Sequence, residues 1–283
     1  MKELIWLNGR TMPLSQARVS VEDRGFQFAD GVYEVIRVYQ GRAYTLREHM
    51  DRLERSCLGI SLPPPIPKAK LAAHIHKLIA KSALDEGMVY VQITRGTCPR
   101  NHVFPKSRPT VLFYTRQLPP MDKPRKSKGL KLITVPDERW NRCWIKSIAL
   151  LPNVLAKNAA IAAGADEAAF VRDGIVTECA TSNLFIVARG SLLTHPVGPS
   201  VLPGVTRSLL LDLAAEAGVD AVERPISEGE ILAADEVFIT STTRELAWVS
   251  HWNGKRLGRA KCGPVTLQLH HAYQKRVAET LPT

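Results

Sequence analysis

The chain has 283 residues, of which 45% are hydrophobic and 23% charged, a balance typical of globular proteins with room for two modest domains. It contains no apolar run near the roughly 20 residues that cross a bilayer, and we recognise no export signal at its beginning. The five cysteines are scattered and never spaced C-x-x-C, which argues against a disulfide framework or a zinc site and indicates a reducing cytoplasm.

Lysine and arginine outnumber aspartate and glutamate by 38 to 27, so the net charge is +11. Such a surplus is compatible with nucleic acid, membrane surfaces or anionic small molecules. The densest basic stretch, residues 123–131, lacks the interleaved aromatic residues that a single-strand binding platform requires. We therefore interpret residues 118–128 as a solvated linker between an N-terminal α/β domain (1–117) and a C-terminal domain (129–283), and expect no nucleic-acid or membrane partner.

In the N-terminal part, turn and capping residues divide the chain into short elements. Asn8-Gly9 suits a type I′ hairpin turn, and Thr45 with Glu48 forms a T-x-x-E capping box that predicts a helix start. The apolar face of that helix leaves Arg52 pointing towards solvent or a ligand. Further predicted elements are strands at 4–7, 32–39, 43–45, 89–94 and 110–115, and a helix over 68–84 after a proline-rich run.

The C-terminal part mixes short strands with single helices. Asp173-Gly174 and Asn253-Gly254 mark two hairpins. The predicted strands cover 131–135, 167–172, 183–187 and 236–240, and the predicted helices cover 154–163, 206–217 and the stretch after residue 264. Hairpins that alternate with single helices indicate an α+β fold rather than a doubly wound sheet.

The strongest catalytic motifs, including the Walker A loop and the G-x-S-x-G elbow, are absent. Lys146 is instead flanked by aromatic and aliphatic residues near two arginines, surroundings that disfavour an ammonium ion, as Schiff-base chemistry requires. A surface lysine at a strand end is the alternative. Glu178 precedes a small polar run, where it could hold a ring nitrogen protonated or simply cap a turn.

Three loops carry groups suited to anions. Residues 202–207 lead directly into a helix, whose first amides bind phosphate readily, and residues 238–243 end a strand in a cluster of hydroxyls. Ordinary capping and turn chemistry also explains both segments. Arg100 and His102 share a loop broken by glycine and proline and form a candidate trap for a carboxylate, with solvent-exposed charge as the alternative.

Together these segments resemble the D-amino-acid aminotransferases, in the fold-type IV class of pyridoxal-phosphate enzymes with branched-chain aminotransferase-like architecture. The matching stretches follow the family order over nearly the whole chain, at residues 22–34, 90–102, 140–147, 177–185, 202–207 and 241–243. The resemblance implies a two-domain α+β fold with a small α/β domain and a larger pseudo-barrel domain. It also implies the cofactor pyridoxal 5′-phosphate, and a homodimer whose active site lies at the subunit interface.

The resemblance further implies a role for each matching residue. Lys146 would carry the cofactor and shuttle a proton, and Glu178 would pair with the pyridine nitrogen. The remaining roles are a phosphate cup (Arg52, Val205, Thr206, Ser241 and Thr242), an apolar residue on the ring (Leu202), and a trap for the substrate carboxylate (Tyr33, Arg100 and His102, with the loop from the neighbouring subunit). Cys179 and Ala180 stand where glycine and serine are common, and Pro203 replaces a more flexible residue.

The activity implied is amino-group transfer between a D-amino acid, of the D-alanine or D-glutamate type, and a 2-oxo acid such as 2-oxoglutarate or pyruvate. The Arg-x-His loop favours D-substrates, because the side that holds the carboxylate decides which enantiomer turns its Cα–H bond towards Lys146. Alternatives on the same fold are a branched-chain L-amino-acid transaminase, an (R)-amine transaminase and an aminodeoxychorismate lyase. A further hypothesis, that the chain is a nucleic-acid-binding protein without catalytic activity, rests on the +11 charge alone, and no recognition motif supports it.

Overall fold

The structure is a computed structural model that describes residues 2–119, 128–258 and 261–281. Its contacts define two compact units, one made of Met1–Pro120 with Ile145–Ala149 and the other of Met121–Trp144 with Leu150–Pro282. The segment around Lys146 therefore packs with the first unit. Most of the predicted linker, 118–128, lies outside the described residues, and the division into domains at its ends stays a prediction.

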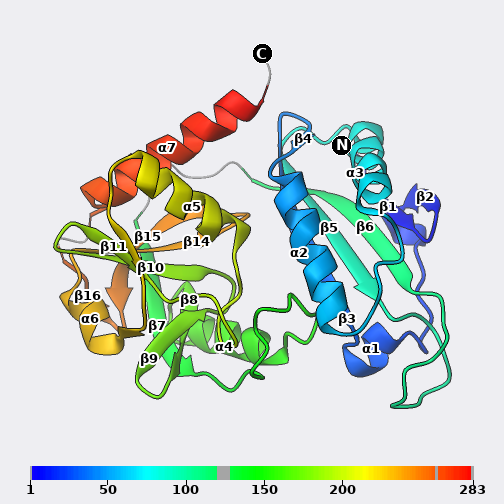
Figure 1. Cartoon of the computed structure of the whole chain (residues 1–283), viewed down its shortest axis with the longest axis horizontal. Helices are drawn as coiled ribbons and strands as arrows, with labels where there is room; N and C mark the ends of the chain where they lie inside the picture. Colours follow the sequence, from blue (N-terminus) through cyan, green and yellow to red (C-terminus); the bar gives the residue numbers. More distant parts are fainter. Residues whose placement is uncertain (1, 120–127, 259–260, 282–283) are drawn as a thin grey trace. The chain divides into compact units, whose positions relative to one another are not determined.

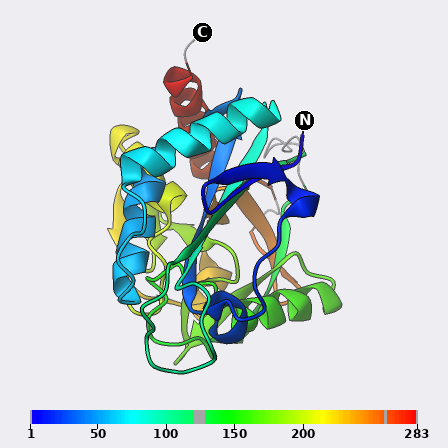
Figure 2. The same cartoon turned by 90° about the vertical axis from the view of Figure 1, so that its right-hand side faces the viewer.

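The first unit is an antiparallel sheet with two helices on one face (Figures 1 and 2), in the strand order β2-β1-β6-β5-β3-β4. Its strands are β1 (Leu4–Leu7), β2 (Arg10–Pro13), β3 (Gly31–Tyr39), β4 (Arg42–Ala43), β5 (Gly87–Thr94) and β6 (Thr110–Gln117). Its helices are η1 (Leu14–Gln16, 3-10), α1 (Arg24–Phe28), α2 (Leu46–Gly59) and α3 (Lys68–Ser82). The predicted apolar face of α2 is confirmed, because Met50, Leu53 and Cys57 are buried in the core between helix and sheet.

Turn chemistry is confirmed in this unit, but the capping box is not. Asn8 and Gly9 have φ of 48° and 95°, as a type I′ turn requires. Thr45 does precede α2, but its φ of 49° is left-handed and its side chain caps no helix amide. The hydroxyl donates to the Tyr44 carbonyl instead, and Glu48 pairs with Arg47. The predicted capping box is therefore wrong, because an N-cap side chain reaches the helix amides from extended backbone.

The second unit is built on a longer mixed sheet, in the order β12-β11-β10-β14-β15-β7-β8-β9-β13 with β16 on β15. Its strands are β7 (Leu130–Pro136), β8 (Glu167–Arg172), β9 (Ile175–Cys179), β10 (Asn183–Ala188), β11 (Ser191–Thr194), β12 (Ala221–Glu223), β13 (Ile226–Ser227), β14 (Glu236–Ser241), β15 (Glu245–Trp252) and β16 (Lys255–Arg256). Its helices are α4 (Leu151–Ala162), α5 (Val205–Glu216), α6 (Glu228–Ala233) and α7 (Pro264–Thr280). Helices α5 and α7 pack on each other and on β14 (Figure 1).

Both hairpins predicted in this unit are present. Asp173 and Gly174 join β8 to β9 with φ of 52° and 75°, and Asn253 and Gly254 join β15 to β16 with φ of 48° and 76°. Most strand pairs are antiparallel, and the exceptions are β15 with β7, β7 with β8 and β11 with β12. The α+β class predicted from the sequence is confirmed. Among the residues described, no helix is long and apolar enough to span a membrane.

Candidate functional site

Lys146 lies in an extended segment that is tied to the start of β3. Its carbonyl accepts a hydrogen bond from the Tyr33 amide at 2.9 Å, and its own amide donates to the Ser56 hydroxyl of α2 at 3.1 Å. The next residue, Ser147, forms an isolated bridge with Val32. The backbone of Lys146 is thus fixed on both sides, while its side chain stays half-buried with Nζ 4.3 Å from the centre of the Tyr33 ring.

Tyr33 belongs to a row of aromatic rings on one face of the first sheet. The rings of Tyr33 and Tyr90 stack with centroids 5.8 Å apart, and those of Tyr90 and Tyr114 stack at 5.1 Å. Burial raises the pKa of Tyr90, so its hydroxyl stays protonated and donates to the Gln92 side-chain oxygen at 2.8 Å. Lys146 Nζ therefore lies against an aromatic surface.

Arg52 is buried, so of the two directions expected for its side chain, the one towards solvent is wrong and the one towards a ligand stays a prediction. Its Nε and Nη2 donate to the two carboxylate oxygens of Glu34 at 2.7 and 2.8 Å. His49 Nδ1 lies 2.8 Å from Glu34 Oε2, and it carries the proton there because an ionised carboxylate only accepts. The side chain turned inward because β3 offers it a carboxylate that fits the guanidinium fork.

Burial acts on the pKa values of both partners of Arg52. Burial alone raises the pKa of Glu34, but the charge and hydrogen bonds of Arg52, together with the hydrogen bond from His49, outweigh it and hold that pKa far below the usual range. Burial also lowers the pKa of His49, and the nearby Glu34 carboxylate offsets this only in part. The result is an ionised carboxylate, a charged guanidinium and a neutral imidazole, all buried.

Arg100 and His102, the other predicted members of the carboxylate trap, lie on an exposed loop against Phe28. The Arg100 guanidinium is 4.2 Å from the centre of the Phe28 ring, and the His102 ring is 5.2 Å from it. Tyr33 instead contacts Lys146. The structure therefore splits the predicted trap into two groups within this chain.

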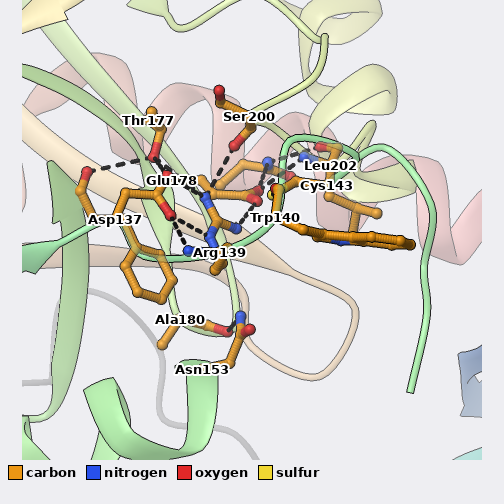
Figure 3. Close-up of polar contacts among 12 residues, drawn as sticks. Asp137, Arg139, Trp140, Cys143, Asn153, Thr177, Glu178, Ala180, Ser200 and Leu202 are labelled. Atoms are coloured by element: carbon orange, nitrogen blue, oxygen red, sulfur yellow. Dashed lines mark hydrogen bonds and ion pairs between the residues drawn. The ribbon is translucent and has the colours of Figure 1, made fainter. Parts of the chain in front are cut away.

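Glu178, at the end of β9, is buried and held from three sides (Figure 3). Its Oε1 accepts from Arg139 Nη1 at 2.5 Å. Its Oε2 accepts from the Asn183 side-chain amide at 3.0 Å and from the Leu202 backbone amide at 3.1 Å. The Leu202 carbonyl in turn accepts from Asn183 at 3.0 Å. The predicted ring residue and the predicted ring-nitrogen partner are thus brought together, with the carboxylate fixed in direction.

Arg139 is a functional candidate that the sequence reasoning missed. Its Nε and Nη2 donate to both oxygens of Asp137 at 2.8 and 2.9 Å, and its Nη2 also donates to the Ser200 carbonyl at 2.9 Å (Figure 3). The guanidinium lies 4.2 Å from the centre of the Phe170 ring. The Asp-x-Arg spacing just before the lysine segment was a signal for such a fork, but it could not show that the fork reaches Glu178.

The start of α5 forms a cradle of backbone amides. Gly204 is its N-cap, no side chain caps this end, and the first residues Val205 and Thr206 are buried. A Cβ on Gly204 would overlap the Asn183 side-chain oxygen, so only glycine fits here. Free amides at a helix start carry partial positive charge and suit an anion.

The second predicted cradle follows β14, which packs on α5. Ser241 and Thr242 are half-buried there, and the Ser241 hydroxyl accepts from the Arg244 amide at 3.3 Å. The adjacent Thr240 hydroxyl is fully buried and, among the described residues, has no hydrogen-bond partner. A buried hydroxyl without a partner costs free energy, which a ligand oxygen would recover. In the described parts of the chain, no cluster of three His, Cys, Asp or Glu side chains could hold a metal ion.

Known proteins are similar to this chain along its whole length. The family model of class IV aminotransferases matches residues 31–252. The D-alanine aminotransferase of Bacillus licheniformis is 41% identical over 283 residues, which cover 99% of each chain. The D-alanine aminotransferase of Staphylococcus aureus (strain MSSA476) is 37% identical over 279 residues, 97% of this chain and 98% of the relative.

Solved structures of related enzymes have a similar fold at lower sequence identity. The T.th. branched-chain amino acid aminotransferase with pyridoxamine 5′-phosphate superposes with a TM-score of 0.92 at 26% identity, covering 100% of this chain and 96% of the other. The branched-chain aminotransferase of Thermoproteus uzoniensis with norvaline gives 0.89 at 26% identity, with coverages of 99% and 96%. The architecture of these enzymes therefore extends over both units.

Proposed function

The chain belongs to the class IV aminotransferase family, and we propose that it transfers an amino group between a D-amino acid and a 2-oxo acid, with pyridoxal 5′-phosphate bound at Lys146. The observation that carries the choice of substrate is the 41% identity to a D-alanine aminotransferase over 99% of both chains. The branched-chain enzymes, although similar in fold, are 26% identical. D-alanine with 2-oxoglutarate is therefore the pair of substrates to test first.

The chemistry of the described groups fits this cofactor. Its aldehyde needs a primary amine, its pyridine nitrogen an acceptor that stays ionised, and its phosphate several neutral or cationic donors. Lys146 offers the amine, and Glu178 offers a carboxylate already paired with Arg139. The amides at Val205 and Thr206, where no side chain caps α5, offer donors to a phosphate. So does the Thr240 hydroxyl of β14, which has no hydrogen-bond partner within the described residues.

We assign the other phosphate contacts to Arg52, Ser241 and Thr242. Glu34 holds the Arg52 guanidinium in one orientation through Nε and Nη2, so this side chain offers a phosphate a cation of fixed direction. Leu202 would pack on the ring, because its backbone amide already holds the carboxylate that faces the ring nitrogen.

When bound, the cofactor supplies an electron-withdrawing ring that stabilises negative charge at the substrate Cα. Lys146 Nζ would take the proton from the substrate Cα and deliver it to the cofactor, and in the second half of the cycle it would move a proton in the opposite direction. Glu178 keeps the ring nitrogen protonated, because a carboxylate that accepts hydrogen bonds favours a cation beside it. Tyr33, next to Lys146, lines the place where the substrate binds.

Arg100 and His102 would bind the substrate carboxylate in a neighbouring subunit of a homodimer. In this chain both contact Phe28 rather than the Tyr33 and Lys146 group. The loop also carries exposed apolar side chains, with Val103 73% and Phe104 57% exposed, as expected of a surface that a second copy covers.

The five cysteines are all thiols, which supports a reducing, cytoplasmic location.

Mixed dimers test the contribution of the second subunit. Lys146→Ala and Arg100→Ala each inactivate their own homodimer, but a mixed dimer of the two holds one site with both groups intact. We expect co-purified mixtures to regain activity, and no recovery from a verified mixed dimer would show that both groups serve the same chain.

The substrate is tested by amino-group exchange with 2-oxoglutarate or pyruvate, with D- and L-donors assayed separately. We expect D-alanine and D-glutamate to be donors, and the L-enantiomers to react far more slowly. Exchange from L-leucine or L-valine alone would instead identify a branched-chain transaminase. Release of pyruvate and an aromatic amine from aminodeoxychorismate would identify a lyase.

A further inference from the structure

Asp137, Arg139 and Glu178 form a buried relay of charges behind the proposed ring-nitrogen partner (Figure 3). We propose that Arg139 is a positioning residue which keeps the shared proton on the cofactor's ring nitrogen and off Glu178. Asp137 holds the guanidinium in place for this task. The inference rests on the proposed role of Glu178 and adds the group that controls its charge.

The relay is built from bonds that only an arginine can make together. One edge of the guanidinium binds both oxygens of Asp137, and the remaining Nη1 binds Glu178 Oε1 at 2.5 Å. The Asp137 carboxylate also accepts from the Thr177 hydroxyl at 3.0 Å. A lysine in this position would keep the charge but would lose the two-sided fork.

The three side chains are well shielded from water, with exposed fractions of 7% for Arg139, 6% for Glu178 and 0% for Asp137. Burial alone lowers the pKa of Arg139, but Asp137 and Glu178 raise it above its usual value, so the guanidinium stays charged. Burial alone raises the pKa of Asp137, but Arg139 and then Arg172 hold it below its usual range. Asp137 and Arg139 are therefore both charged.

Four other ionisable side chains lie around these three residues. Arg172 Nη2 lies 3.3 Å from Asp137 Oδ1, and Glu167 is buried on β8. Burial raises the pKa of Cys143 to about 11 and that of Cys179 well above its usual value, so both thiols are neutral. Arg139 thus brings a full positive charge into direct contact with Glu178.

This contact decides where a shared proton lies. A carboxylate that is hydrogen-bonded to a guanidinium resists protonation, so the proton stays on the ring nitrogen. Removing Arg139 would take this guanidinium away while Glu178 stays buried, which shifts the balance towards the uncharged acid. The acid would donate its proton in a hydrogen bond to a neutral ring nitrogen.

The test uses Arg139→Met, Arg139→Lys and a matched control, Arg172→Met. Arg172 also contacts Asp137 and Ser200 but makes no contact with Glu178 in the described residues. The double variant Asp137→Asn with Arg139→Met removes both charges of the buried pair at once, so it keeps the test valid if Arg139→Met alone does not fold.

The first measurement is the ¹⁵N NMR shift of a ¹⁵N-labelled cofactor ring in each holoenzyme. We expect the pyridinium signal in the unaltered protein and in Arg172→Met, its loss in Arg139→Met and the double variant, and partial retention in Arg139→Lys. A pyridinium signal that persists in both Met variants would overturn the inference.

A second measurement does not depend on the cofactor. In the cofactor-free proteins, infrared difference spectra report a protonated carboxyl band. We expect this band at neutral pH in Arg139→Met, and its disappearance when Glu178→Gln is added. If the carboxyl band appears in Arg139→Met but the unaltered protein does not bind the cofactor, only the proposed function is contradicted. If the protein binds the cofactor but the band is missing in Arg139→Met, only the role of Arg139 is contradicted.

Discussion

Arg52 Nε lies 2.7 Å from Glu34 Oε1, and neither side chain is more than 4% exposed. The guanidinium proposed to meet the cofactor phosphate is therefore fixed by the protein alone. The two side chains of this ion pair come from neighbouring elements. Glu34 lies on β3 and Arg52 on α2, with His49 one turn earlier on the same helix. Such a fixed cation needs little reorganisation when an anion binds.

Replacing Glu34 by glutamine is expected to destabilise the protein by about 3 kcal/mol, because Arg52 then remains buried without this counter-charge. The measurement is urea-induced unfolding at neutral pH. Glu48→Gln is the matched control, because the side chain of its partner Arg47 is 85% exposed and such exposed pairs add little stability. Equal stability of the two variants would show that the buried pair does not contribute.

The stability of the protein should fall on acidification in two steps. The pKa values of His49 and Glu34 are both lowered by folding, so the unfolded chain binds more protons than the folded one. The stability that each group contributes is complete above its unfolded pKa, and it is lost below about 6.5 for histidine and below about 4.3 for glutamate.

Unfolding by urea at pH 7, 6 and 5 checks the first of these steps. His49→Asn keeps a donor near Glu34 but cannot titrate, so we expect it to flatten the decline between pH 7 and 5. If the unaltered protein and the variant lose stability equally over this range, another group is responsible.

Gly204→Ala should weaken binding of the cofactor without unfolding the protein. The new Cβ would overlap the Asn183 side-chain oxygen, so Asn183 must move away from Glu178 and from the Leu202 carbonyl. The hydrogen bond from Asn183 to the charged Glu178 is worth about 1.5–3 kcal/mol. If its loss acts on cofactor binding, the affinity for the cofactor falls roughly tenfold or more.

Equilibrium titration of the cofactor-free protein with pyridoxal 5′-phosphate measures this effect. Gly198→Ala serves as its control, because a Cβ there meets nothing within 4 Å. Unchanged affinity in Gly204→Ala would mean that the glycine at the start of α5 is not needed for the cradle.

Local chemistry made much of the fold predictable. The pairs Asn8-Gly9, Asp173-Gly174 and Asn253-Gly254 all form turns with positive φ at both residues, which asparagine, aspartate and glycine accept with little strain. Capping motifs were less reliable. The box at Thr45 is not formed, whereas Ser227 and Glu230 do form one at the start of α6, a signal that was present in the sequence and was missed.

The rest of the fold depends on contacts between distant residues. Strands β11, β12 and β13 are two to four residues long and gain order from pairing with β10, β11 and β9, which no local pattern reveals. The same reason hid the role of Arg139, whose partner Glu178 is 39 residues away in sequence. Lys146 and Glu178 could be singled out because resemblance, not spacing, pointed to them.

The central claim is that Lys146 holds the cofactor covalently, and borohydride reduction followed by peptide mapping tests it most directly. Reduction makes the link between the lysine amine and the cofactor permanent, so the label marks the residue that forms it. Our account predicts a pyridoxyl label on the peptide that contains Lys146 and none in Lys146→Ala. A label on Lys157, or on any other lysine of the unaltered protein, would contradict it.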